Sequence, residues 1–148
     1  MPKITRTALV SHSAEQMFDL VGDFAKYPEF LPWCSGAKVI KSSESEIIGE
    51  LQIQKGGVRQ SFSTRNYLTR PARIDLSLVS GPFKSLSGYW KFEQLGDHAC
   101  RITLELEFEF SARVIAMAIG AIFSQIAGSL VDAFCERADQ LYVTPHGD

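Results

Sequence analysis

The C-terminal part of the chain places the strongest constraint on its fold. Residues 112–143 contain no proline, and residues 114–131 contain no charged side chain. This composition predicts one helix of about eight turns, with Ser111 as its N-cap and Pro145 as its stop. Glycine, serine and glutamine interrupt the uncharged stretch, so an amphipathic helix that is buried or touches a membrane fits better than a membrane-spanning one.

One side of this predicted helix is apolar along its whole length. Steps of 100° per residue place the following residues on that side: Ile119, Phe123, Ile126, Ala127, Leu130, Phe134 and Leu141. The opposite side is polar only in the second half, because Val114, Met117, Ala118 and Ala121 occupy it in the first half. Together with the proline-rich segment 27–34, this half of the helix is predicted to form an apolar patch at the mouth of a cavity. Such a patch indicates contact with a membrane or a partner, and the alternatives are a dimer interface or cover by a neighbouring loop.

Residues 37–110 show the alternation of antiparallel strands joined by tight turns. In the clearest strand, residues 102–110, apolar side chains alternate with Thr103, Glu105, Glu107 and Glu109. Turns are predicted at Gly56-Gly57, Gly81-Pro82 and Gly96-Asp97. The resulting sheet has one apolar face and one wet face, so it needs a cover.

The N-terminal segment predicts a strand at residues 3–10, followed by two short helical pieces. Ser13 and Gln16 have the spacing of a capping box, and Met17, Leu20 and Val21 give the helix that follows an apolar side. Residues 27–34 hold two prolines and several aromatic residues, which limits any further helix to about one turn. We expect this segment to act as a plug.

Together these elements predict a single α+β domain over residues 1–148. The long C-terminal helix is the only element large enough to cover the apolar face of a sheet of about seven strands. A curved antiparallel sheet wrapped around such a helix is the helix-grip arrangement, and it encloses a cavity.

Bulk composition excludes several other classes of protein. A formal charge of -2 and a pI near 5.9 give no global attraction to nucleic acid or acidic membranes. Cys34, Cys100 and Cys135 are too few and too widely spaced for a disulfide framework or a zinc cluster, so we expect buried free thiols. The first residues lack a secretory signal, and a cytoplasmic location is expected.

Support for catalysis in the sequence is weak. It contains no nucleotide-binding glycine motif, no H-E-x-x-H and no paired-cysteine motif, so no catalytic residue and no metal site is predicted. His12, His98 and His146 are expected at the surface, and no base is placed near Cys34.

The order of several short motifs resembles the RatA and coenzyme Q-binding family of START-like proteins, over nearly the whole chain. The motifs are Ser13-Ala14-Glu15-Gln16-Met17, Tyr27-Pro28, Phe30-Leu31-Pro32, Thr64-Arg65-Asn66, Gly81-Pro82-Phe83-Lys84, Trp90-Lys91-Phe92, Ala99-Cys100-Arg101-Ile102 and Phe108-Glu109-Phe110. The resemblance implies a helix-grip fold and a hydrophobic ligand, with ubiquinone or a related lipid as first candidate and no required cofactor. It equally implies a toxin that binds the large ribosomal subunit, hinders subunit joining and has an antitoxin partner. Some relatives of this fold are polyketide cyclases.

A quinone needs an apolar slot, an aromatic surface and a few polar groups. We expect Phe30, Leu31 and Trp33 to gate such a cavity. The predicted lining consists of Leu51, Phe62, Leu76, Trp90, Leu104, Leu106, Phe123 and Leu130. A filled core without a cavity is the alternative. A carrier of this kind would support respiratory electron transfer and dock transiently at the inner membrane.

Residues 55–91 contain seven basic residues and one acid, Asp75. If several of them share one strand face, they form a phosphate-binding surface suited to ribosomal RNA. The candidate RNA-binding residues are Lys55, Arg59, Arg65, Arg73 and Lys84. A solvated strand face with scattered cations is the alternative.

Overall fold

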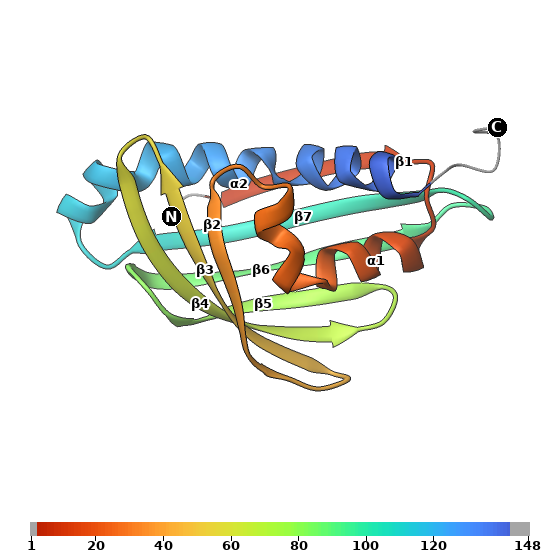
Figure 1. Cartoon of the computed structure of the whole chain (residues 1–148), viewed down its shortest axis with the longest axis horizontal. Coiled ribbons are helices and arrows are strands. Elements are labelled where there is room, and N and C mark those ends of the chain that lie inside the picture. Colours follow the sequence, from red (N-terminus) through yellow and green to blue (C-terminus); the bar gives the residue numbers. More distant parts are fainter. Residues whose placement is uncertain (1–2, 143–148) are drawn as a thin grey trace.

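The computed structural model describes residues 3–142 and contains one antiparallel sheet of seven strands (Figure 1). The strands are β1 (Lys3–Val10), β2 (Cys34–Ser42), β3 (Glu46–Lys55), β4 (Val58–Thr69), β5 (Arg73–Ser80), β6 (Phe83–Gln94) and β7 (Cys100–Phe110). Their order in the sheet is β1-β7-β6-β5-β4-β3-β2, so β1 lies beside the last strand and β2 forms the far edge. The predicted α+β helix-grip fold is confirmed.

A single long helix, α2 (Arg113–Leu141), covers the concave side of the sheet. Figure 1 shows β1 and β7 running alongside α2, whereas β3 and β4 lie at a steep angle to it. Since neighbouring strands twist steadily with respect to each other, the sheet curls around the helix.

Two short helical elements, α1 (Ala14–Gly22) and the 3-10 helix η1 (Phe24–Glu29), connect β1 to β2. The predicted capping box is present: Ser13 Oγ accepts from the Gln16 backbone N–H at 3.1 Å, and Gln16 Oε1 accepts from the Ser13 N–H at 3.0 Å. Met17, Leu20 and Val21 are buried. The Tyr27 hydroxyl donates to the Val21 carbonyl, which ties η1 back onto α1.

The start of α2 differs from the prediction by one residue. Ala112 is the N-cap, and the Ser111 hydroxyl donates instead to the Pro82 carbonyl at 3.2 Å. The Ser111 side chain therefore binds the turn between β5 and β6 and does not cap the helix. The predicted end near Val143 and the stop at Pro145 lie outside the described residues.

The buried side of α2 matches the prediction in its first half and shifts in its second. Ile119, Phe123, Ile126, Ala127 and Phe134 are buried, Leu130 is half-buried, and Leu141 is 49% exposed. Val131 and Ala138 are buried instead. The helix packs against β1 and α1 as well as against β7, and the contacts with β1 and α1 move the buried stripe away from Leu141.

The predicted turns are confirmed by their backbone angles. Gly56 and Gly57 have φ values of 58° and 82°, as a tight hairpin between β3 and β4 requires. Gly81 and Gly96 also have positive φ values.

Candidate functional site

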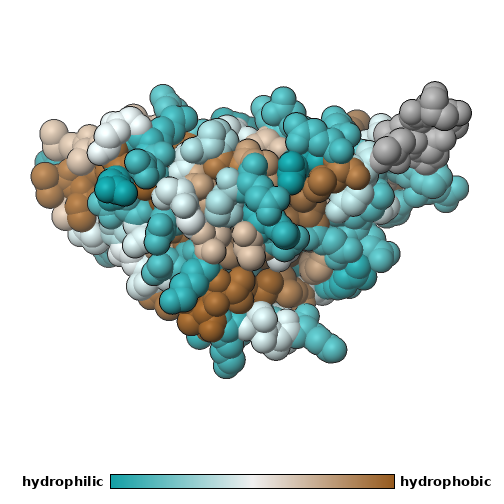
Figure 2. Space-filling view, viewed as in Figure 1, coloured by the Kyte–Doolittle hydropathy of each residue, from teal (hydrophilic) through white to brown (hydrophobic). Residues whose placement is uncertain are grey.

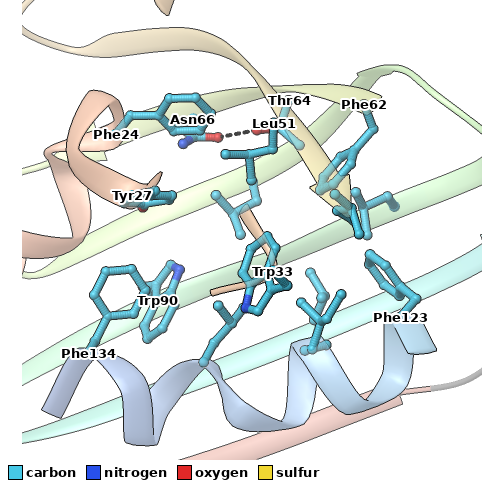
Figure 3. Close-up of a pocket in the computed structure, with 17 residues that line it drawn as sticks. Phe24, Tyr27, Trp33, Leu51, Phe62, Thr64, Asn66, Trp90, Phe123 and Phe134 are labelled. Atoms are coloured by element: carbon cyan, nitrogen blue, oxygen red, sulfur yellow. Dashed lines mark hydrogen bonds between the residues drawn. The ribbon is translucent and has the colours of Figure 1, made fainter. Parts of the chain in front are cut away.

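A cavity of about 80 Å³ lies between the sheet and α2 (Figure 3). Its wall is contributed by η1, β3, β4, β5, β6, β7, α2 and the residue just before β2. The lining residues are Phe24, Tyr27, Trp33, Leu51, Ile53, Phe62, Thr64, Asn66, Leu76, Leu86, Trp90, Leu106, Phe123, Ile126, Ala127, Leu130 and Phe134.

Aromatic rings form the two ends of this cavity. At one end, Phe134 meets Trp90 and Tyr27 edge-to-face, with ring centroids 5.2 and 5.3 Å apart. At the other, Phe123 meets Phe62 at 6.1 Å, and Figure 3 shows Trp33 between the two groups. Such edge-to-face pairs are favourable arrangements of aromatic side chains, so the ends of the cavity are well packed.

The polar groups of the cavity come mainly from β4. Thr64 and Asn66 are two residues apart and therefore share the inner face of the strand. Thr64 Oγ1 donates to Asn66 Oδ1 at 2.8 Å. None of the lining residues carries a charged side chain. The cavity is thus apolar, with one uncharged polar spot.

The cavity is small for a ring-shaped ligand. A cavity of roughly 150 Å³ is enough to hold benzene, and about 80 Å³ is well below that size. The structure is therefore intermediate between the two alternatives, a filled core and an open slot. A quinone ring fits only if lining side chains move.

Most of the predicted ligand residues line this cavity: Trp33, Leu51, Phe62, Leu76, Trp90, Leu106, Phe123 and Leu130. The structure does not bring Phe30, Leu31 and Leu104 to its wall. Leu31 and Leu104 are each 1% exposed within the packed core, and Phe30 faces an outer groove. Alternation gives the side of a strand on which a residue lies, but not its distance from a void.

Trp33 separates the cavity from this outer groove. It lines both spaces and is 6% exposed. The groove has a volume of about 360 Å³ and runs between the plug segment and the second half of α2, where the Arg137 guanidinium lies over the Phe30 ring at 5.1 Å. Trp33 thus lies between the two spaces, and its role as a gate stays a prediction.

Sequence reasoning missed about half of the cavity wall. The additional lining residues are Phe24, Tyr27, Ile53, Thr64, Asn66, Leu86, Ile126, Ala127 and Phe134. For Thr64 and Asn66 a signal existed, because both share the inward parity of Phe62 in β4. Polar residues on an otherwise apolar strand face are the mark of a lined cavity.

The candidate RNA-binding residues are not a uniform basic surface. Arg65 lies 3.5 Å from Glu46, Arg73 lies 2.9 Å from Asp75 and 4.0 Å from the Tyr89 ring centroid, and Lys84 lies 3.4 Å from Glu109. Neighbouring strands bring in Glu46 and Glu109, which are distant in the sequence, whereas Asp75 lies in the same strand as Arg73. Nearby carboxylates therefore neutralise much of the positive charge of residues 55–91.

Lys55 and Arg59 differ from these paired cations. They flank the hairpin between β3 and β4, and both are exposed. Within residues 3–142, neither has a carboxylate oxygen within 4.0 Å. Such cations bind phosphate without first breaking an ion pair.

The thiols lack the environment of an activated nucleophile. Burial raises the pKa of the Cys34 thiol, whose Sγ donates to the Gly36 carbonyl at 3.3 Å. Burial also raises the pKa of Cys100 to about 11. Both thiols therefore stay protonated and unreactive at neutral pH.

The prediction of a surface position is wrong for His12. It is 2% exposed and its Nε2 lies 2.7 Å from Asp139 Oδ1, at the end of α2. Packing of α2 against the corner after β1 buries it. His98 is exposed as predicted, and His146 lies outside the described residues. Within the described part of the chain no group of three or more histidine, cysteine or acidic residues is placed to hold a metal.

The first half of α2 presents an apolar patch, but residues 27–34 are not part of it, because Phe30, Pro32 and Trp33 line a groove with the second half of α2. Val114 and Met117 are 72% and 81% exposed, and Ala118 and Ala121 are exposed beside them. Figure 2 shows apolar surface at the end of the molecule where α2 begins. By length and composition α2 could cross a membrane, a property that core helices of soluble proteins share. Contact with a membrane and dimerisation stay predictions.

Comparison with known proteins agrees with this fold. The pattern of the family described as "Polyketide cyclase / dehydrase and lipid transport" matches residues 10–135. A START superfamily protein from Mycobacterium smegmatis superimposes with a TM-score of 0.78 at 22% identity, over 95% of this chain and 99% of that one. The Zhui aromatase/cyclase from Streptomyces superimposes with a TM-score of 0.81 at 15% identity, over 94% of both chains.

Curated relatives give a narrower match. "Ribosome association toxin RatA" of Vibrio cholerae is 49% identical over 96% of this chain and 99% of its own length. "Coenzyme Q-binding protein COQ10 homolog B, mitochondrial" of Xenopus laevis is 22% identical over 93% of this chain and 58% of its own length. The chain therefore belongs to the START-like family of polyketide cyclases, dehydrases and lipid transport proteins and, within it, to the RatA proteins.

Proposed function

We propose that this protein associates with the ribosome, as the name of its RatA relatives describes, and that the large subunit is its target. The observation that carries the proposal is the 49% identity with the Vibrio cholerae protein over almost the whole of both chains. Other relatives at 45–48% identity bear the same name. Lys55 and Arg59 are the cations best placed to contact phosphates, because they project beside the β3–β4 hairpin without an ion pair among the described residues.

Charge reversal at this hairpin tests the proposal. We expect the wild-type protein to co-sediment with the large subunit in a salt-sensitive way, and we expect Lys55→Glu/Arg59→Glu to move most of it to the free fraction, because each phosphate contact contributes to the salt dependence of binding. Sucrose-gradient sedimentation of lysate, with quantitative detection of the protein across a series of salt concentrations, measures both effects.

Arg6→Glu/Arg101→Glu is the matched control, because it makes the same change of charge at exposed positions of β1 and β7. The control should sediment as the wild type does. Equal loss in both variants would assign the association to net charge, and wild-type protein that remains free at every salt concentration would refute ribosome association.

We also propose that the cavity binds a small apolar molecule. The supporting observation is the lined, uncharged space between the sheet and α2, with Trp33 between it and the outer groove. Ubiquinone is a candidate only through the 22% identical coenzyme Q-binding relative. The proposal concerns binding alone, and an antitoxin partner and a cytoplasmic location at or near the inner membrane stay predictions.

Organic extraction of the purified protein followed by mass spectrometry tests ligand binding. We expect a near-stoichiometric apolar compound from the wild type and much less from Ala127→Leu. Ala127 lines the cavity and is 1% exposed, so the carbons that leucine adds would fill part of the space of about 80 Å³. Ala121→Leu makes the same change on the exposed side of α2 and should retain the compound. Repeated extraction that yields nothing from the wild type would count against a bound ligand.

A further inference from the structure

The amide of Asn66 is the polar group whose hydrogen bonds the fold leaves incomplete at the cavity. The residue is 8% exposed, and its Oδ1 accepts from Thr64 Oγ1 at 2.8 Å. Figure 3 shows this bond as the one hydrogen bond among the lining residues, so Asn66 Nδ2 donates to none of them. An amide nitrogen carries two donor hydrogens, so this group can donate to a molecule in the cavity that it lines.

Among the other polar groups at the cavity, the two hydroxyls have already donated their hydrogens. The Tyr27 hydroxyl donates to the Val21 carbonyl, and the Thr64 hydroxyl donates to Asn66. Trp33 and Trp90 each offer an indole N–H, which can only donate, and Figure 3 shows no bond from either to another lining residue. The donors of the wall that remain free are thus N–H groups, those of Asn66 and of the two tryptophans.

The surroundings of Asn66 strengthen any bond that it makes. The Phe24 ring lies beside it in Figure 3. This ring occupies space that Gly49 leaves open, because a Cβ at Gly49 would lie 2.5 Å from Phe24 Cε1. Aromatic and aliphatic side chains exclude water around the amide, and a hydrogen bond is electrostatically stronger in such a low-dielectric site.

These observations limit the chemistry of a ligand. A carboxylate or phosphate would be buried without a cation in the wall, which is strongly unfavourable. A pure hydrocarbon would leave the Asn66 donor unpaired. A carbonyl oxygen accepts hydrogen bonds and carries no charge, so it matches what the wall offers.

We propose that the cavity selects uncharged, carbonyl-bearing apolar molecules and that the carbonyl oxygen accepts a hydrogen bond from Asn66 Nδ2. This inference rests on the proposed binding of an apolar molecule in the cavity and adds the chemical class and the residue that recognises it.

Two probes of nearly equal shape test the inference: cyclohexanone, which carries a carbonyl, and methylenecyclohexane, in which a CH₂ group replaces the oxygen. The chain has two tryptophans, Trp33 and Trp90, and both line the cavity, so intrinsic fluorescence reports occupancy. We expect Asn66→Leu to lower the ratio of cyclohexanone affinity to methylenecyclohexane affinity by about 3- to 10-fold, the usual worth of one hydrogen bond. Gln60→Leu makes a matched amide-to-leucine change at an exposed position of β4 that does not line the cavity, and it should leave this ratio within about twofold of the wild type.

The outcomes separate the inference from the binding that it presumes. If neither neutral probe binds the wild type, ligand binding in the cavity fails. If both bind and Asn66→Leu leaves the ratio unchanged, binding stands and the role of Asn66 is refuted. Should Asn66→Leu not fold, cyclohexanecarboxylate decides with the wild type alone, because an anion that binds as tightly as cyclohexanone contradicts selection for uncharged molecules.

Discussion

Phe134→Ala is expected to lower the free energy of unfolding by about 3–5 kcal/mol, the usual cost of removing a buried phenylalanine side chain. Phe134 is 1% exposed, and its ring meets those of Tyr27, Phe30 and Trp90 at centroid distances of 5.2–5.3 Å. It therefore joins α2, η1 and β6 at one end of the cavity. Urea denaturation followed by circular dichroism measures the loss.

The same substitution enlarges the cavity, because Phe134 is part of its wall. Saturating methylenecyclohexane should therefore recover part of the lost stability, since a ligand that binds only the folded state stabilises it. Met117→Ala, at an 81% exposed position of the same helix, is the control and should change stability by less than about 0.5 kcal/mol. A loss below about 1 kcal/mol for Phe134→Ala would contradict the packing described for this end of the cavity.

Gly88→Ala is expected to destabilise the protein by about 3 kcal/mol, at the upper end of the cost of overpacking. A Cβ at this position would lie 2.1 Å from the carbonyl oxygen of Glu105 in the neighbouring strand β7. The obstructing atom belongs to the backbone, so β6 and β7 must separate locally. Gly88 pairs with Leu76 and Leu106, which both line the cavity, and the separation would distort its floor.

Gly22→Ala is the matched control for this change, because a Cβ there meets no atom within 4 Å. It lies at the end of α1, where alanine is favoured over glycine. Thermal denaturation of both variants gives the comparison. If the Gly88→Ala protein is as stable as the Gly22→Ala protein, the backbone of β7 does not approach Gly88 as closely as the structure indicates.

The cavity lies between the sheet and α2, where the helix-grip arrangement predicts it, and its small size limits what it can hold. Trp33 and the aromatic ends leave about 80 Å³, so an isoprenoid quinone needs rearrangement of the gate and of part of the packed core. A single ring or a short chain needs less. The proposed ribosome association does not require this space, because Lys55 and Arg59 are exposed and neither of them lines it.

The arrangement of elements could be predicted from the sequence because it depends on local patterns. The alternation of residues 102–110, the glycines at 56, 57 and 96, and the Ser13–Gln16 capping box each act within a few residues, and the structure confirms them. The inward side of each strand follows from parity alone. Five of the eight predicted residues that line the cavity lie in strands and reached its wall for this reason.

Only the tertiary structure decided which inward residues border a void, which cations are free and which side chains cap or close an element. Leu104 and Leu106 have the same parity, yet Leu106 lines the cavity and Leu104 lies in the filled core. Arg65 and Arg59 look alike in the sequence, yet Glu46 from the neighbouring strand pairs with Arg65. Periodicity along a chain gives the direction of a side chain, whereas voids, ion pairs and buried polar groups arise between elements that are distant in sequence and meet only in the folded protein.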